Sequence, residues 1–273
     1  MKRILVPFDF SPQSIEALKF AVNFAKKERD GIVLLHAIEF PAIVNSSVAL
    51  EFERQYMEVH RARATSSITK IARRVAKDVE VETIIDFGGP IHVIERAIES
   101  SRIDLVVMGT QGASGLKEFT IGSNTQKVAR RSTVPVIAIR KSVRQIDNII
   151  FPVPPEGEVP KEIVDFVKSL QEFFDAKLQV LFVNTPYDFG RDVKVKPALA
   201  AFCRRHQLRD CTVSVFNDRT GSEGIVNFAK GFENVMVAMG THGRHGIRVL
   251  AFGSVAEDVV NHIDCPVATL RMK

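Results

Sequence analysis

Short apolar runs alternate along this chain with longer segments whose apolar residues recur at helical spacing. The first run, Ile4 to Val6, is typical of a strand buried on both faces. Ser11 then provides an N-cap with Pro12 at the first helical position, so a helix is predicted to begin there. The buried stripe of this helix is expected at Ile15, Leu18, Val22 and Ala25.

The first half of the chain repeats this order of strand and helix. Because strands that alternate with helices pair in parallel, this half is predicted to form a parallel sheet with helices on both sides. The strands are expected at residues 4–6, 32–38, 81–85, 104–108 and 135–139, and the helices from 12, over 50–77, over 91–100 and from 123.

The second half restarts the same order after a short linker near residues 142–145, with a second helix at 195–206 that is much shorter than its counterpart at 50–77. We therefore predict an α/β fold of two tandem, doubly wound, Rossmann-like domains at 1–143 and 144–273, each with a five-stranded parallel sheet. The strands of the second half are expected at residues 149–151, 178–183, 212–216, 235–239 and 266–270.

The fifth strand of each half, 135–139 and 266–270, is apolar and would leave an exposed sheet edge. We predict that these two strands pair antiparallel and join the halves as an intramolecular pseudo-dimer. Further homodimerisation through another face stays open.

A glycine-rich string occurs twice, as MGTQGASGLKEFTIGS at 108–123 and MGTHGRHGIRVLAFGS at 239–254. A shift of 131 residues superposes the two copies without a gap, which indicates a duplicated domain. Glycines at fixed offsets allow tight turns or close approach of a ligand to the backbone. The matched positions are Gly109, Gly112, Gly115, Gly122 and Ser123 with Gly240, Gly243, Gly246, Gly253 and Ser254.

Composition fits an ordinary globular protein, because 45% of the 273 residues are apolar and 25% are charged. No stretch approaches the roughly 18 apolar residues that span a bilayer. The apolar run at the start is broken by Pro7 and closed by Asp9, unlike a signal peptide. We therefore expect a cytoplasmic protein with no membrane partner.

The net charge of +5 permits weak association with anions. The basic pairs lie within helical patterns and lack interleaved aromatic residues, so solvated helix faces are expected, with no specific nucleic-acid partner. These pairs are Arg73-Arg74, Arg130-Arg131 and Arg204-Arg205.

The three cysteines, Cys203, Cys211 and Cys265, are odd in number and lack C-x-x-C spacing. This pattern argues against a disulfide framework or a zinc knuckle. We expect three small buried residues.

The first glycine string leaves the fourth strand, and its end, Gly122-Ser123, leads into a helix. The free N–H groups and positive dipole of a helix N-terminus favour an anion, and Ser123 could donate its hydroxyl to a phosphate. In the alternative interpretation, Ser123 only caps the helix and the glycines only shape the turn. The string is neither a Walker sequence nor a Rossmann G-x-G-x-x-G after the first strand.

With these segments the chain resembles a tandem universal stress protein, whose two domains have the adenine-nucleotide alpha-hydrolase-like fold. The resemblance also covers VPFDFSPQS at 6–14, LLHAI at 34–38 and DLVVMG at 104–109. Nucleotide-binding members of that family carry G-x-x-G-x9-G-[S/T], which both glycine strings match.

The resemblance implies an ATP site in the first domain, where Asp9 would contact the nucleoside and Ala37 would lie against the base. The alternative for Asp9 is a helix-entry residue that supports the turn before Ser11. His36 is expected to be a structural histidine at a strand end. The implied nucleotide site comprises Pro7, Phe8, Asp9, Ala37, Gly109, Gln111, Gly112, Gly122, Ser123 and Asn124.

The second domain has Pro154 at the position of Asp9, and proline offers neither a carboxylate nor an N–H. Its glycine string with nearby basic residues leaves a possible anion site without normal adenosine recognition. The two loop histidines, His242 and His245, are weak evidence for a metal, and no metal site is predicted. The possible second site comprises Gly240, His242, Gly243, Gly253, Ser254 and Val255.

No set of nucleophile, base and acid can be assembled from the motifs, so no catalytic residue is predicted. The resemblance favours a stress-response regulator that binds ATP in the first domain, with any Mg²⁺ held by the phosphates. The alternatives are an interaction protein that needs no nucleotide, and a slow ATPase.

Overall fold

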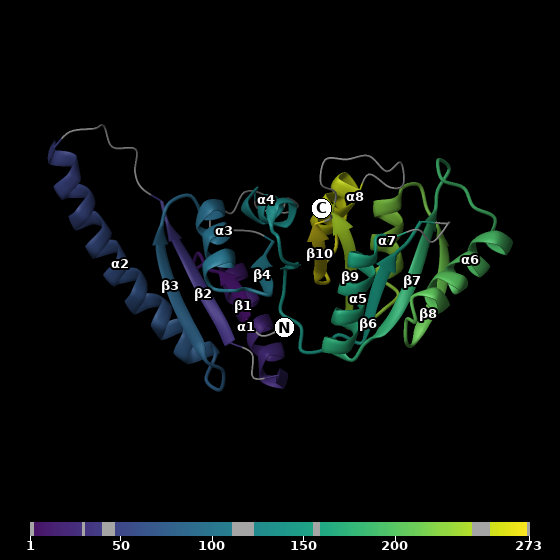
Figure 1. The fold of residues 1–273 in the computed structure, drawn as a ribbon, viewed down its shortest axis with the longest axis horizontal. Helices are drawn as coiled ribbons and strands as arrows, with labels where there is room; N and C mark the ends of the chain where they lie inside the picture. Colours follow the sequence, from purple (N-terminus) through teal and green to yellow (C-terminus); the bar gives the residue numbers. More distant parts are fainter. Residues whose placement is uncertain are drawn as a thin grey trace.

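The computed structural model describes residues 3–28, 31–39, 47–110, 123–154, 159–241 and 252–271. Ten strands form one continuous sheet in the order β3-β2-β1-β4-β5-β10-β9-β6-β7-β8, with helices packed on both faces (Figure 1). Each half contributes five neighbouring strands, so the two halves meet at the middle of the sheet.

The elements of the first half lie close to the predicted ranges. They are β1 (Arg3–Pro7), α1 (Pro12–Glu28), β2 (Gly31–Ile38), α2 (Ser47–Val75), β3 (Val81–Phe87), α3 (Pro90–Ser100), β4 (Leu105–Gly109), α4 (Ser123–Arg131) and β5 (Val136–Ile139).

The second half repeats the order with a shorter second helix, as the sequence predicts. Its elements are β6 (Asn148–Pro152), α5 (Lys161–Phe174), β7 (Lys177–Asn184), α6 (Asp192–Arg205), β8 (Cys211–Asn217), α7 (Gly221–Ala229), β9 (Val235–Thr241), α8 (Phe252–His262) and β10 (Val267–Arg271).

All strand pairs within a half are parallel, whereas β5 and β10 pair antiparallel, with Ala268 opposite Ile137. The predicted fold class and the predicted pairing of the fifth strands are therefore confirmed. The physical cause is the apolar character of β5, whose four residues are all buried and would otherwise form an edge.

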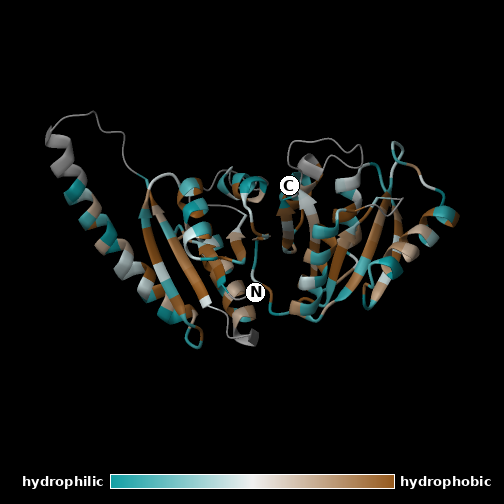
Figure 2. Cartoon of the chain, viewed as in Figure 1, coloured by the Kyte–Doolittle hydropathy of each residue, from teal (hydrophilic) through white to brown (hydrophobic). Residues whose placement is uncertain are grey.

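The central strands are buried on both faces, which explains their continuous apolar runs (Figure 2). On the face covered by α1, α2, α5 and α6, one hydrophobic core runs across both halves. Each half has its own smaller core on the opposite face.

Helix α1 begins as predicted, because the Ser14 N–H donates to Ser11 Oγ at 3.1 Å. This bond satisfies one of the N–H groups that a helix N-terminus leaves without an internal partner.

Four phenylalanines join α1 of the first half to α5 of the second. The ring centroid of Phe24 lies 4.7 Å from that of Phe20, 4.6 Å from that of Phe174 and 6.3 Å from that of Phe173. All four side chains are buried. This cluster, Phe20, Phe24, Phe173 and Phe174, adds a hydrophobic contact to the pairing of β5 with β10.

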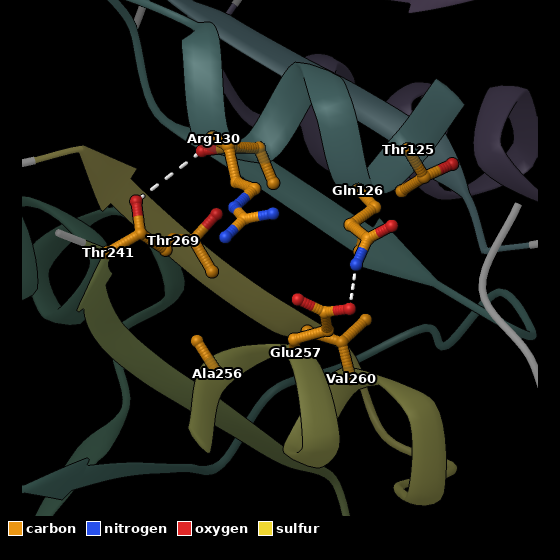
Figure 3. A pocket seen from close by; sticks show the side chains of 10 residues that line it. Thr125, Gln126, Arg130, Thr241, Ala256, Glu257, Val260 and Thr269 are labelled. Atoms are coloured by element: carbon orange, nitrogen blue, oxygen red, sulfur yellow. Dashed lines mark hydrogen bonds between the residues drawn. The ribbon is translucent and has the colours of Figure 1, made fainter. Parts of the chain in front are cut away.

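Polar contacts join the halves on the other face, from α4 to α8 and to the end of β9. Gln126 donates through its amide to the Glu257 carboxylate, and Thr241 Oγ1 donates to the Ala129 carbonyl at 3.4 Å (Figure 3). The cavity beside these contacts has a volume of about 30 Å³. It is therefore far too small for a nucleotide.

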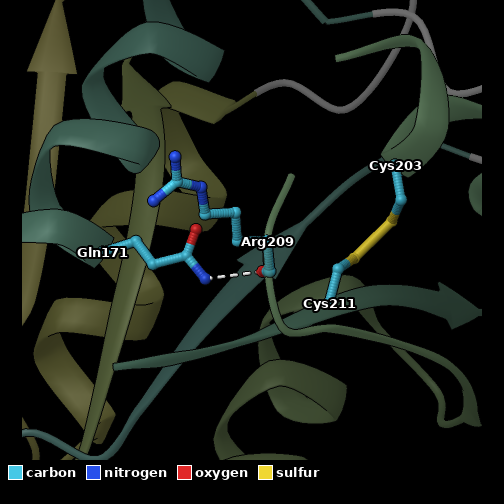
Figure 4. The surroundings of a disulfide bond; sticks show 4 residues. All are labelled: Gln171, Cys203, Arg209 and Cys211. Atoms are coloured by element: carbon cyan, nitrogen blue, oxygen red, sulfur yellow. Dashed lines mark hydrogen bonds between the residues drawn. A yellow bond between two sulfur atoms is a disulfide. The ribbon is translucent and has the colours of Figure 1, made fainter. Parts of the chain in front are cut away.

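Cys203 and Cys211 form a disulfide, so the sequence-based expectation for these two cysteines is wrong (Figure 4). Their Cα atoms lie 6.7 Å apart because the end of α6 packs beside the start of β8. Sequence spacing does not reveal that proximity. Cys265 is a free thiol, and burial raises its pKa to about 12.

No helix in the part of the chain that the structure describes has both the length and the apolar character required to cross a membrane.

Candidate functional site

Three neighbouring strands bring part of the predicted nucleotide site to one sheet edge. Pro7 ends β1, Gly109 ends β4, and Ala37 precedes the last residue of β2. These strands are adjacent in the order β2-β1-β4, so their carboxyl ends lie side by side. In open parallel sheets, ligands bind at such an edge.

Asp9 lies in the loop between β1 and α1, and its side chain is exposed. Its Oδ1 accepts the Ser11 N–H at 3.0 Å. This bond is the helix-entry contact that the sequence left open for Asp9. The exposed carboxylate is thus held at the sheet edge by the backbone of its own loop.

Phe8 offers its backbone to this edge, because its ring is buried. The Phe8 N–H donates to the Leu35 carbonyl at 2.7 Å, which continues the β1–β2 ladder by one residue. The Phe8 carbonyl lies 2.7 Å from His36 Nδ1. His36 therefore supports the loop, in line with the structural role expected for it.

Gly109 packs closely against the start of α1. A Cβ at this position would lie 2.8 Å from the backbone carbon and oxygen of Gln13, a separation too short for any side chain. The first glycine of the string is thus required for contact between β4 and α1. The sequence does not reveal Gln13 as its neighbour, because no motif links them.

Ser123 and Asn124 open α4 and are exposed. Buried Thr125 donates through Oγ1 to the Gly109 carbonyl at 2.8 Å, which ties the start of α4 to the end of β4. Thr125 was not among the predicted site residues. The remaining predicted positions, Gln111, Gly112 and Gly122, lie outside the described residues.

The second half has an equivalent sheet edge with different chemistry. Pro152 pairs with Leu181 as Pro7 pairs with Leu35 in the first half. Two residues further along, exposed Asp9 corresponds to buried Pro154. The two halves therefore differ at the position that would recognise a nucleoside.

The possible second anion site is described only in part. Gly240 lies within buried β9 and pairs with Leu270. Gly253 and Ser254 belong to the first turn of α8, and Val255 follows there with a half-buried side chain. The other two residues, His242 and Gly243, lie outside the described residues.

Among the described residues, no three His, Cys, Asp or Glu side chains are grouped so that they could hold a metal ion.

The model of the universal stress protein family matches the chain twice, at residues 1–140 and 146–271. The chain belongs to the universal stress protein family. Its two matched segments correspond to the two halves of the sheet.

Single-domain relatives align with about half of this universal stress protein. Universal stress protein YxiE of Bacillus subtilis is 31% identical over 145 residues, which cover 50% of this chain and 98% of the relative. Universal stress protein MJ0577 of Methanocaldococcus jannaschii is 30% identical over 156 residues, which cover 51% of this chain and 95% of the relative.

The tandem arrangement also has a solved counterpart. A universal stress protein from Archaeoglobus fulgidus matches with a TM-score of 0.73 over 98% of both chains, at 20% identity. At that identity the similarity concerns the fold.

Proposed function

We propose that this universal stress protein is a nucleotide-dependent regulator that binds ATP in its first domain. The observation that carries the proposal is the difference between the halves at one position, where exposed Asp9 corresponds to buried Pro154. Both halves keep the glycine string. At this position the first half has a carboxylate and the second half has a proline.

The described residues at the sheet edge fit an adenine nucleotide. The Asp9 carboxylate would accept hydrogen bonds from the ribose hydroxyls, and Ala37 would lie against the base. The exposed Ser123 at the start of α4 would donate to a phosphate, with help from the free N–H groups of the helix. Mg²⁺ would be held by the phosphates, because Mg²⁺ commonly binds phosphate oxygens rather than a complete protein cage.

Calorimetry with ATP and Mg²⁺ tests this proposal on the wild type and on Asp9→Asn. Asparagine keeps a side-chain oxygen for the Ser11 N–H, so the turn before α1 is preserved while the charge is lost. Loss of a hydrogen bond to a charged group costs about 1.5–3 kcal/mol, which corresponds to roughly a 10- to 150-fold weaker affinity.

Asp192→Asn is the matched control, because Asp192 lies in the second half on α6 and pairs with Lys196 there. One ATP per chain, weakened only by Asp9→Asn, is expected. Two equal sites, or unchanged affinity in Asp9→Asn, would contradict the proposal.

The contact between Asp9 and the Ser11 N–H also favours a second candidate, an interaction protein that needs no nucleotide. In that case Asp9 would serve only the helix entry. Mass spectrometry of material released from the purified protein distinguishes the two, because an ATP-binding protein is expected to release adenine nucleotide. Slow hydrolysis would appear as phosphate release that Asp9→Asn reduces.

The proposed domains span 1–143 and 144–273. The boundary falls between the end of β5 at Ile139 and the start of β6 at Asn148. The regulator is proposed to act in the cytoplasm, which cell fractionation would test.

A further inference from the structure

The first domain has a pocket of about 270 Å³ next to the loop that carries Asp9. Phe10, His36 and Ile38 line it from the loop after β1 and from β2. Its other wall is one stripe of α2, formed by His60, Arg63, Ala64 and Ser67.

This pocket and the proposed nucleotide site lie on opposite faces of β2. Side chains alternate between the two faces of a strand, so His36 and Ile38 lie opposite Ala37, which is the predicted base contact. Ile38 belongs to the core that α1 and α2 cover, whereas Ala37 packs with the core on the α3 face. The pocket therefore lies across β2 from Ala37, on the opposite face of the sheet from the predicted base contact.

Phe10 forms an aromatic wall of the pocket at a cost in backbone energy. Its φ is 65°, in the left-handed region that residues other than glycine seldom adopt. The Phe10 ring packs edge-on against the rings of His36, with centroids 4.8 Å apart, and Phe8, with centroids 5.2 Å apart. Strained residues of this kind cluster at ligand sites.

The face of α2 that lines the pocket combines a buried apolar residue with polar ones. Ala64 and Ile68 are buried in the core, and the neighbouring positions His60, Arg63 and Ser67 line the pocket together with Ala64. Arg63 forms no hydrogen bond or ion pair within the described part of the chain, although nearby Arg61 donates to the Ile85 carbonyl at 2.8 Å.

Among the described residues, none that lines the pocket carries a carboxylate. His60 stacks on Tyr56 with centroids 3.9 Å apart, which orients its ring. The lining residues Arg63, Ser67 and His60 suit a carboxylate, because arginine binds that group through paired N–H donors.

The second half of the chain has a different residue at the position of His36. The register that pairs Pro7 with Leu35 and Pro152 with Leu181 places Phe182 at the position of His36. Phe182 is 1% exposed and belongs to the core. The imidazole that lines the pocket in the first domain therefore has a buried phenylalanine as its counterpart in the second.

We propose that this pocket binds a small organic anion, namely a carboxylate with an aromatic or branched apolar body. The apolar body would lie against Phe10, Ile38 and Ala64, and the carboxylate would meet Arg63 and Ser67. The volume lies just below the range of about 300–1,000 Å³ typical of larger ligands, so the ligand is small.

Benzoate is the probe, and its neutral analogue benzamide is the control ligand. Titration of the full chain followed by ligand-observed NMR should show benzoate binding about tenfold more tightly than benzamide, after allowance for the exposure of Arg63. Arg63→Gln should remove this preference. Arg74→Gln, an exposed arginine on the same helix and away from the pocket, should keep it.

Ser67→Leu should abolish binding of both probes, because the larger side chain fills the pocket. Circular dichroism checks that each variant is folded, and Arg63→Gln changes an exposed side chain and so remains informative if Ser67→Leu does not fold. Equal binding of benzoate and benzamide, no benzoate binding at millimolar concentration, or full retention of the preference in Arg63→Gln would overturn the proposal.

A titration of benzoate against ATP separates this site from the proposed nucleotide site. Benzoate should bind without nucleotide and should not be displaced by ATP. Displacement by ATP would mean one shared site and would refute the independent pocket. Benzoate binding in a protein that fails to bind ATP would leave this inference standing while the proposed function fails.

Discussion

Replacement of Phe24 by alanine should weaken the joint between the two halves of the chain. Phe24 is 1% exposed, and its ring contacts one phenylalanine of its own helix and two of α5. Phenylalanine-to-alanine changes in a core cost about 3–5 kcal/mol through lost burial and the cavity left behind. Because three rings surround this site, we expect a loss near the middle of that range, about 4 kcal/mol.

The assay is urea denaturation followed by far-UV circular dichroism. A loss of about 4 kcal/mol is a large part of the roughly 5–15 kcal/mol that stabilises most native proteins. The midpoint of Phe24→Ala should therefore fall markedly. Phe228→Ala, an aromatic residue packed within the second half beside Phe216, is the control for a change that does not touch the joint.

A double-mutant cycle assigns the effect to the contact between the halves. Phe24 and Phe174 meet edge-on with an interplanar angle of 89°, and such pairs contribute about 0.5–1.5 kcal/mol beyond burial. The double variant should therefore lose less than the two single losses added together. A loss below about 1 kcal/mol in Phe24→Ala, or strict additivity with Phe174→Ala, would refute this account of the joint.

Three further changes probe other parts of the structure. Ile137→Pro removes a backbone donor from β5, which pairs with a strand on each side. Small-angle scattering should then show a looser domain pair, and an unchanged profile would contradict the pairing. Partial burial alone would raise the pKa of Asp86, but the Arg96 guanidinium lowers it overall. The ion pair therefore stabilises the fold at pH values above the ordinary carboxyl pKa, and this contribution is lost as pH falls through the lowered pKa. Urea midpoints in neutral and acidic buffer should therefore converge for wild type and Asp86→Asn at acidic pH. Replacing Cys203 and Cys211 by serine should lower the unfolding free energy by roughly 2–3 kcal/mol, and reducing agent should do the same only in the wild type.

The sequence predicts the elements of this fold well because each strand is a short apolar run with a helical pattern after it. The apolar fifth strand indicates that β5 needs a partner, and the resemblance to single-domain universal stress proteins, which dimerise through this edge, implies that the partner is β10. The elements themselves rest on local patterns that each strand or helix carries.

The features that the sequence does not predict depend on contacts between residues far apart in the chain. The approach of Gly109 to Gln13, and the packing of Phe24 on Phe174, arise only when the sheet has formed. The pocket beside Phe10 was missed for the same reason, because its walls come from a loop, a strand and a distant helix. The order of residues along the chain does not show which distant residues come close together in the folded protein.

The contact between Gln126 and Glu257 has a consequence for how this chain evolved. The two residues are equivalent under the shift of 131 residues, and they meet where the halves join. In a symmetric dimer a residue near the axis contacts its own copy, so its side chain must be compatible with an identical side chain opposite it. A self-paired second domain would set two Glu257 carboxylates against each other, whereas the fused chain pairs a carboxylate with an amide. Fusion thus releases each side of the joint to change independently of the other.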